Sequence, residues 1–473
     1  MGPAAQVRLP LRGERDGSSQ SQRAVKGQKR EREDDFDRLA LTFDLDLFFL
    51  SLSLNSPRSS FAARGKLSVP RVWSRSEASS TALADALIPR PVSTFGGGEE
   101  GEEGGGGALD EILTSDDVDA VLLVLPVQAM PSVARRALRA GKAVLQEKPV
   151  AGTVAEALET LAVAREAAAA AKEKGGGGGG KNPLLPVFAL AENYRSEPGV
   201  LAAAAAASEL SPPSASSGVT TISLVGNMPM DRSNRYHGSR WRRDAAGCPG
   251  CFLMDSSVHF VAALRSVGGA AGLGEPSRVG ARATSRCGAG NDLPAPDTLA
   301  AWIEYGAGGG EQEDGHGAGG ATSTTRPTTS TSTTTGTVSV TFAGAAPRFA
   351  LTLDTRAGAV ELSRGGYGGA ASGRGAGYTV AVSRSPAAAG EGSDTTFHPF
   401  GGLEAELEAL LRLSRGRGTA ADAAALSPAS AARDLALVEA MLRSSAGGGA
   451  PTAVEEIARG VDPLESSGFG VAV

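Results

Sequence analysis

Residues 119–126 of the chain read Asp-Ala-Val-Leu-Leu-Val-Leu-Pro, and residues 143–149 read Ala-Val-Leu-Gln-Glu-Lys-Pro. Both are short apolar runs bounded by polar residues or proline, a pattern typical of strands buried in a parallel sheet. Residues 127–140 between them have the length of a crossover helix. The pattern predicts a β–α–β unit with Glu147 and Lys148 at the carboxyl end of its second strand, where open α/β sheets bind ligands.

Strands and helices continue to alternate on both sides of this unit. Upstream, residues 67–75 read as a short strand, residues 77–87 as a helix and residues 108–113 as the start of another helix. Downstream, residues 153–174 form an alanine- and glutamate-rich helix, and residues 186–194 a further strand. This alternation predicts an α/β fold with a doubly wound, Rossmann-like parallel sheet.

Low-complexity segments mark the limits of this first domain. Residues 1–60 read as a poorly ordered extension, and residues 61–195 as the Rossmann-like domain. Within the domain, an acidic glycine insert occupies residues 96–107 and a glycine linker residues 175–182. Both segments have the composition of flexible connections.

The second predicted domain, residues 196–473, has strands in succession rather than in alternation with helices. The expected strands are residues 219–225, 298–305, 336–342, 349–354, 358–363 and 378–382, and the expected helices are residues 255–265, 403–413 and 431–445. The Ser/Thr/Gly-rich residues 306–335 lie between two of the strands and read as a disordered insertion. The pattern predicts an α+β domain with a mostly antiparallel sheet.

Composition argues against several classes of partner. The chain has 473 residues, with 64 glycines and 5% aromatic residues, so part of its length cannot pack into a core. Its 46 Lys and Arg against 52 Asp and Glu give a net charge of -6, without a basic stripe, which argues against nucleic acid as a partner. No apolar stretch approaches the roughly 20 residues that span a bilayer, so we expect no membrane partner.

Cysteine usage and the first residues indicate a compartment. Three cysteines make no disulfide framework and suit a reducing environment. Residues 1–33 mix basic and acidic side chains without an apolar core, unlike a secretory signal, and their acidic residues argue against a transit peptide. We therefore expect a cytoplasmic protein, while an organellar location stays open.

Lys148 is the first candidate for chemistry. It follows an almost entirely apolar strand, and Pro149 fixes the chain direction after it. A partly desolvated lysine at this point can donate hydrogen bonds to a substrate oxygen and stabilise developing negative charge. The alternative is a surface lysine that begins a loop.

A second candidate lies in residues 250–264, Gly-Cys-Phe-Leu-Met-Asp-Ser-Ser-Val-His-Phe-Val-Ala-Ala-Leu. Asp255 and His259 are four residues apart and share a helix face, so the carboxylate could orient the imidazole. The imidazole could then act as a general acid or base near neutral pH. The alternative is that Asp255 caps the helix and His259 is half buried against the sheet.

The cofactor preference is predicted from Ser74 and Arg75. They follow the strand that ends in Trp73, at the position where a dinucleotide-binding sheet meets the adenosine ribose. An acidic residue there suits NAD, and an arginine suits the 2′-phosphate of NADP. The pair therefore favours NADP over NAD, with a solvated arginine in a turn as the alternative.

Other motifs have the residue spacing of a functional site but lack the further residues that such a site needs. Cys248-Pro-Gly-Cys251 has redox or zinc spacing, but no second ligand pair follows and Cys287 stands alone. We therefore expect no metal, and a redox role for Cys248 and Cys251 is a minor alternative. The glycines at residues 288–290 and 373–377 do not open a helix after a strand, so neither predicts a phosphate loop.

Together these residues resemble the Gfo/Idh/MocA oxidoreductases, the family of glucose-fructose oxidoreductase and inositol dehydrogenase. The motifs that carry the resemblance are Asp119 to Pro126, Glu147-Lys148-Pro149, Ala191 to Arg195, Trp241-Arg242, and the Asp255 and His259 pair. The resemblance runs from about Val72 to the C-terminus. It implies a Rossmann domain that holds NAD(P), a C-terminal domain whose sheet covers a small-molecule substrate, and a possible homo-oligomer.

The resemblance also implies roles for particular residues. Lys148 would bind the reacting oxygen, His259 would exchange its proton, and Asp255 would hold His259 or a substrate hydroxyl. The implied cofactor contacts are Ser74, Arg75, Leu125, Pro126, Glu147 and Lys148, and the implied substrate contacts are Tyr194, Arg195, Trp241 and Arg242.

The chain departs from the family at its first strand, so the predicted Rossmann-like sheet is incomplete. Family members begin with a strand and a GxGxxG turn whose amides receive the cofactor pyrophosphate. Here residues 60–65, Ser-Phe-Ala-Ala-Arg-Gly, have one glycine, and residues 41–54 could replace the strand but not the turn. Either residues 1–65 are not the authentic start of the protein, or tight cofactor binding has been lost.

Two functions remain in competition. The first is an NADP-dependent oxidoreductase that acts on a CH–OH or carbonyl group of a sugar, polyol or related small molecule. The second is a non-catalytic or regulatory relative that keeps the two-domain shell. Lys148, Asp255 and His259 favour the first, and the missing glycine turn favours the second.

Overall fold

The computed structural model of the chain describes two sheets with their helices. The described residues are 39–43, 71–74, 77–86, 93–96, 105–175, 188–212, 218–234, 236–286, 293–294, 296–306, 334–365, 376–385, 393–414 and 417–461. Apart from their ends, the predicted inserts lie outside these residues, as does most of the predicted extension. Arg75 and Cys287 also lie outside them.

Six strands form the first sheet. They are β1 (Leu39–Phe43), β2 (Arg71–Ser74), β3 (Ser93–Gly96), β4 (Ala120–Val124), β5 (Ala143–Glu147) and β6 (Phe188–Ala191). Their order is β3-β2-β1-β4-β5-β6, and all neighbours are parallel. This is the strand order of a doubly wound dinucleotide-binding sheet. The predicted Rossmann-like fold is therefore confirmed.

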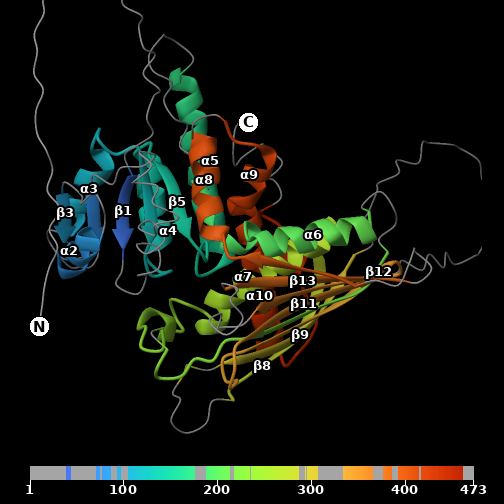
Figure 1. The fold of residues 1–473 in the computed structure, drawn as a ribbon. Coiled ribbons are helices and arrows are strands. Elements are labelled where there is room, and N and C mark those ends of the chain that lie inside the picture. Colours follow the sequence, from blue (N-terminus) through green and yellow to red (C-terminus); the bar gives the residue numbers. More distant parts are fainter. Residues whose placement is uncertain are drawn as a thin grey trace, which may run out of the picture. The chain divides into compact units, whose positions relative to one another are not determined.

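Strand β1 occupies the interior of this sheet (Figure 1). Leu41 pairs with Val72 of β2 on one side and with Leu122 of β4 on the other. The apolar run at residues 41–54 therefore contributes to the first strand, as its pattern suggested. The residues between β1 and β2, including residues 60–65 and the place of a phosphate-binding turn, lie outside the described residues.

Helices connect the strands of the first sheet. They are α2 (Glu77–Ala86), α3 (Gly105–Thr114), α4 (Met130–Arg139) and α5 (Val154–Gly175). Helix α4 has Pro131 in its first turn, where a missing N–H costs no helical hydrogen bond, and it buries Val133 and Leu138. Gly141, with a φ of +77°, follows its end and lets the chain turn into β5.

Nine strands form the second sheet. They are β7 (Val219–Asn227), β8 (Pro276–Thr284), β9 (Thr298–Tyr305), β10 (Thr334–Thr341), β11 (Arg348–Thr355), β12 (Gly358–Gly365), β13 (Gly377–Arg384), β14 (Ser393–Pro399) and β15 (Thr452–Ala453). Their order is β14-β13-β12-β11-β7-β10-β9-β8-β15. Neighbours are antiparallel except for β7 and β10. The predicted, mostly antiparallel α+β domain is confirmed.

Helices α6 (Pro198–Leu210), α7 (Phe252–Ala270) and α10 (Pro428–Ala446) cover one face of the second sheet (Figure 1). Ile222 and Leu224 of β7 are buried beneath them. Gly226 continues this row, and a Cβ there would lie 2.6 Å from the ring of Phe260 on α7. The glycine therefore permits the close approach that fixes helix α7 on the sheet.

Two helices near the C-terminus, α8 (Gly402–Ser414) and α9 (Ala420–Ala425), complete the core of the first sheet. Leu407, Leu410 and Leu426 are buried in one cluster with Leu122 and Leu145 of the sheet. The short helix α11 (Val454–Ala458) packs on α10. Among the described residues, no helix combines the length and apolar character needed to cross a membrane.

Candidate active site

The carboxyl ends of the first sheet's strands bring the predicted site residues to one edge. Ser74 ends β2 and is buried, Leu125 and Pro126 follow β4, and Lys148 follows β5. Glu192, which the sequence did not single out, follows β6. In parallel sheets this edge receives ligands, because all strands end there together.

Lys148 is held in place by the turn that follows β5. The side chain of Gln146 is fully buried, and its Nε2 donates to the carbonyl oxygen of Val150 at 2.8 Å. The Lys148–Pro149 peptide bond is cis. The Nζ of Lys148 donates to the Oδ1 and the backbone carbonyl oxygen of Asp255 on α7, each at 2.9 Å. The lysine predicted from the first domain therefore contacts the aspartate predicted from the second.

Asp255 is the centre of a buried charge cluster. Its side chain is 6% exposed, and its Oδ2 accepts a hydrogen bond from the Nε of Arg242 at 2.9 Å. Burial raises the pKa of Asp255, but attraction to Arg242 and Lys148 outweighs it and leaves the pKa below its ordinary value. Asp255 is therefore an ionised group that neutralises two cations.

Trp241 and Arg242 belong to a short 3-10 turn, Trp241–Arg243. The guanidinium of Arg242 lies 4.1 Å from the ring centroid of Trp241 and 4.8 Å from that of Tyr236. The Nε2 of Gln128, just after β4, donates to the Trp241 carbonyl oxygen at 3.1 Å. The structure thus brings Trp241 and Arg242 to the Lys148 side of the site.

His259 has a different partner from the one predicted. Its Nδ1 lies 2.7 Å from the Oε1 of Glu192, whose side chain is 2% exposed. Asp255, four residues earlier on α7, is engaged by Lys148 and Arg242 instead. The structure thus pairs Asp255 and His259 with different partners, because a shared helix face does not decide which neighbouring element each side chain meets.

Tyr194 supports the imidazole and Arg195 does not. Tyr194 lies in the turn Asn193–Arg195, and its ring stacks on His259 with centroids 5.0 Å apart. Arg195 is buried and forms an ion pair with Asp434 of α10, which Arg265 also contacts at 2.5 Å. We therefore assign Arg195 to an interior ion-pair network rather than to the substrate contact predicted for it.

Two further carboxyls lie in the electrostatic environment of Glu192. Burial raises the pKa of Glu147 at the end of β5. Burial also raises the pKa of Glu406 on α8 well above its ordinary value, and the nearby carboxyls of Glu147 and Glu192 add to this effect. Burial alone would raise the pKa of Glu192 too, but attraction to His259 lowers it overall. Glu192 is thus the one of these three carboxyls whose pKa is lowered.

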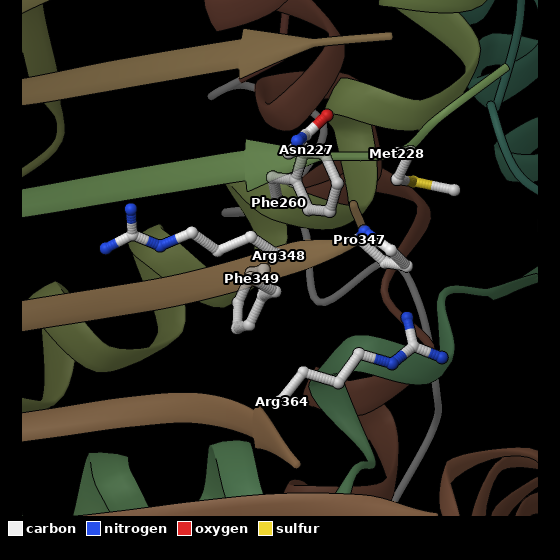
Figure 2. A pocket seen from close by; sticks show the side chains of 7 residues that line it. All are labelled: Asn227, Met228, Phe260, Pro347, Arg348, Phe349 and Arg364. Carbon is white, nitrogen blue, oxygen red and sulfur yellow. The ribbon is translucent and has the colours of Figure 1, made fainter. Parts of the chain in front are cut away.

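A hollow adjoins this aromatic support at the ends of β7 and β11 (Figure 2). It is lined by Asn227, Met228, Phe260, Pro347, Arg348, Phe349 and Arg364. Phe260 directly follows His259 on α7, and Phe349 contacts Tyr194 edge-on with centroids 5.7 Å apart. Figure 2 shows the two arginine side chains on either side of the aromatic rings. The hollow therefore combines apolar walls with guanidinium groups.

The two cysteines of the redox-like motif are buried and free. Burial raises the pKa of both the Cys248 and the Cys251 thiol, which disfavours the reactive thiolate. Within the described ranges, no group of three or more His, Cys, Asp and Glu is arranged to hold a metal ion. The cysteines instead shape the turn before α7, where Cys251 has a φ of +49°.

The edge of the first sheet fits a dinucleotide. The order of its strands reverses between β1 and β4, and the crevice at such a switch point is where doubly wound sheets bind nucleotides. Ser74 lies beside this point at the end of β2, and Leu125 and Pro126 lie at the end of β4. A nicotinamide dinucleotide in this crevice could approach Lys148, one strand further along the sheet.

Known proteins share this arrangement. Residues 56–172 match the Gfo/Idh/MocA oxidoreductase family, which is described by its NAD-binding Rossmann fold. The dehydrogenase FPY6 of Fusarium mangiferae is 30% identical over 201 residues, which are 42% of this chain and 50% of that protein. An uncharacterised protein of Saccharomyces cerevisiae, YMR315W, is 29% identical over 34% of this chain and 39% of its own. The chain thus spans half or less of the length of these curated relatives.

Solved structures extend the likeness to both sheets. An oxidoreductase from Thermotoga maritima is 20% identical, with a TM-score of 0.59 over 89% of this chain and 99% of its own. A levoglucosan dehydrogenase solved with NADH and levoglucosan is 15% identical, with a TM-score of 0.59 over 88% of this chain and 100% of its own. At these identities the likeness is one of fold. Residues 56–172 therefore match the Gfo/Idh/MocA oxidoreductase family, and the two sheets together have the fold of these solved oxidoreductases.

Proposed function

We propose that the chain is an NADP-dependent oxidoreductase that interconverts an alcohol and a carbonyl group of a sugar, polyol or related small molecule. The observation that carries this proposal is the contact between Lys148, at the carboxyl edge of the first sheet, and Asp255, one turn before His259 on α7. A cation and an imidazole are thus placed at the edge where a nicotinamide would bind. When bound, the nicotinamide would accept or return a hydride.

Lys148 would bind the reacting oxygen. An ammonium has three N–H donors, and the described residues use two of them, both at Asp255. The third is left for a substrate oxygen. Its positive charge would stabilise the negative charge that develops on this oxygen when the hydroxyl loses its proton. The carboxylate of Asp255 would keep the ammonium in place throughout.

His259 would exchange the proton of the reacting hydroxyl. Its side chain is 20% exposed, so it is supported on one side and accessible on the other. With Nδ1 at Glu192, Nε2 is the ring nitrogen that remains for the substrate. In the oxidation direction Nε2 would accept the hydroxyl proton, and in the reduction direction it would donate one.

The hollow of Figure 2 would hold the part of the substrate distant from the reacting carbon. The polar side chains in its lining, Asn227, Arg348 and Arg364, can bind hydroxyl groups of a sugar or polyol. The levoglucosan dehydrogenase, which shares the fold, was solved in complex with NADH and levoglucosan. The cofactor preference for NADP rests on Ser74-Arg75 in the sequence.

The first test is a titration of the purified chain with NADPH, followed by nicotinamide fluorescence. We expect saturable binding of NADPH below millimolar concentration. A folded sample that shows no such binding would contradict the proposal. The same result would favour the second candidate, a non-catalytic relative, which the missing GxGxxG sequence supports. A parallel titration with NADH measures the preference for NADP.

The second test compares turnover in variants of the proposed catalytic residues. Lys148→Arg keeps the charge but not the shape, and His259→Asn removes the proton carrier, so each should lower turnover by about 100-fold or more. His398→Asn, on strand β14, is the control and should leave turnover unchanged. Wild-type turnover in either of the first two variants would contradict the roles assigned here.

A further inference from the structure

Glu192 is a buried carboxylate that has so far entered the proposed chemistry only as the contact of His259 Nδ1. It follows strand β6, and its Oε1 accepts a hydrogen bond from the backbone N–H of Tyr194 at 3.1 Å. The same oxygen lies 2.7 Å from the Nδ1 of His259. A single carboxylate thus joins the end of the first sheet to helix α7 of the second domain.

Asp255 cannot provide the same support. Each of its carboxylate oxygens lies 2.9 Å from the nitrogen of a cation, Lys148 for Oδ1 and Arg242 for Oδ2. It therefore serves the oxygen-binding side of the site. Glu192 serves the imidazole side.

The ring of His259 is constrained in two directions. Tyr194 stacks on its face at an interplanar angle of 25°, which restricts tilting, and Glu192 restrains its edge through Nδ1. A carboxylate can only accept a hydrogen bond, so Nδ1 must carry the proton in this contact. In the neutral imidazole, Nε2 then has a free lone pair.

We infer that Glu192 is the positioning residue of His259: it fixes the tautomer with the proton on Nδ1 and directs Nε2 toward the substrate. This inference rests on the proposed function for its consequence in turnover, but its structural part concerns the protein alone. The contact is formed by two side chains of the chain itself.

The surrounding charges favour an ionised Glu192. Burial would raise the pKa of Glu192, but His259 lowers it, and Arg195 and Lys148 act in the same direction. Burial instead raises the pKa of the nearby carboxyls of Glu147 and Glu406, in the direction opposite to the shift of Glu192. Of these three carboxyls, Glu192 is therefore the one suited to accept from His259.

The proton balance of the reaction follows directly. In the oxidation direction the hydroxyl of the substrate would give its proton to Nε2 of His259, while a bound nicotinamide would accept the hydride of the same carbon. The substrate would become a carbonyl compound, and His259 an imidazolium that donates from Nδ1 to Glu192. The carboxylate stabilises this imidazolium without becoming protonated itself, as in hydrolytic triads.

The decisive experiment reads the tautomer by nitrogen-15 NMR in the protein without cofactor. The chain has four histidines, so His259→Asn identifies the signals of His259 by their loss. In the wild type, Nδ1 should carry the proton and Nε2 should be unprotonated. Glu192→Ala removes the acceptor and should shift the population toward a proton on Nε2. Glu197→Gln changes another buried carboxyl, which accepts from Gly401, and should leave the spectrum of His259 as in the wild type.

Kinetics gives the second readout. Glu192→Ala should lower kcat by about 100-fold with KM nearly unchanged, because positioning acts on the proton transfer and not on binding. Glu192→Gln keeps an acceptor oxygen, so its kcat should lie between that of the wild type and that of Glu192→Ala. A kcat in Glu192→Ala equal to the wild type, or a tautomer unchanged in it, would overturn the inference. A tautomer that depends on Glu192 in a protein without NADPH binding or turnover would keep the inference and overturn the proposed function.

Discussion

Replacing Asp255 by Asn removes one negative charge from between two buried cations. The side chains of Lys148, Arg242 and Asp255 are 14%, 6% and 6% exposed, and both pair distances are 2.9 Å. An amide can accept a hydrogen bond but cannot balance either charge. Removing one partner of a buried ion pair costs about 3–5 kcal/mol. We expect Asp255→Asn to lower the free energy of unfolding by this amount.

Urea denaturation of the variant and the wild type measures the difference. Asp110→Asn is the matched control, because Asp110 also pairs with an arginine, Arg136 at 2.6 Å, but is 62% exposed. Exposed pairs contribute about 1 kcal/mol or less. If Asp255→Asn and Asp110→Asn lose the same free energy, the reasoning from burial is refuted.

The pH dependence provides an independent check on Asp255. The pKa of Asp255 is lowered in the folded protein, so its carboxylate contributes fully to stability at pH values above the pKa of an aspartate in the unfolded chain, which is about 4. The contribution is lost as the pH falls below that value toward the lower folded pKa. The stability difference between wild type and Asp255→Asn should therefore shrink as the pH falls from about 5 to about 2. A difference that stays constant over this range would contradict the assigned charge.

Further variants probe the packing and the C-terminal helices. Gly226→Ala places a Cβ 2.6 Å from the buried ring of Phe260 and should destabilise by about 1–3 kcal/mol. Gly269→Ala lies on the same helix as Phe260 but in open space, and it should stabilise the protein by about 0.5–1 kcal/mol. Urea titrations should therefore show changes of opposite sign in the free energy of unfolding of the two variants. The hydrogen bond from Arg412, which outweighs burial, lowers the pKa of Asp422 to about 2. Asp422→Asn should therefore cost about 1 kcal/mol above about pH 4, and its melting curve should converge with the wild type's as the pH falls to about 2.

The strands of the first sheet could be predicted where burial on both faces leaves an apolar run. The runs ending at Val124 and Glu147 are of this kind, and the structure places both strands within one or two residues of the prediction. Strand β3, Ser-Thr-Phe-Gly, has too little apolar sequence to be recognised. Helix α6 was not predicted for another reason, since its alanine-rich sequence has no apolar periodicity.

The candidate site could be predicted only as separate parts. The strand end identifies Lys148, and the helical spacing identifies Asp255 and His259. The sequence cannot show which residues from other elements meet them, and Glu192, the partner of His259, comes from a strand 67 positions earlier in the chain. Arg195 shows the same limit, because its membership in a motif does not tell that its side chain turns inward to Asp434.

Helices α8 and α9 give the chain a particular order of assembly during synthesis. Strands β2, β4 and β5 leave the ribosome long before helices α8 and α9, whose apolar side chains cover Leu122 and Leu145. Until then this face of the nascent sheet lacks the cover that the apolar side chains of these two helices give it, and exposed apolar faces attract chaperones or aggregate. A fragment that ends before α8 would contain the six described strands of the first sheet and still lack part of its core. The carboxyl edge of this sheet can therefore become fully packed only after α8 and α9 have been synthesised.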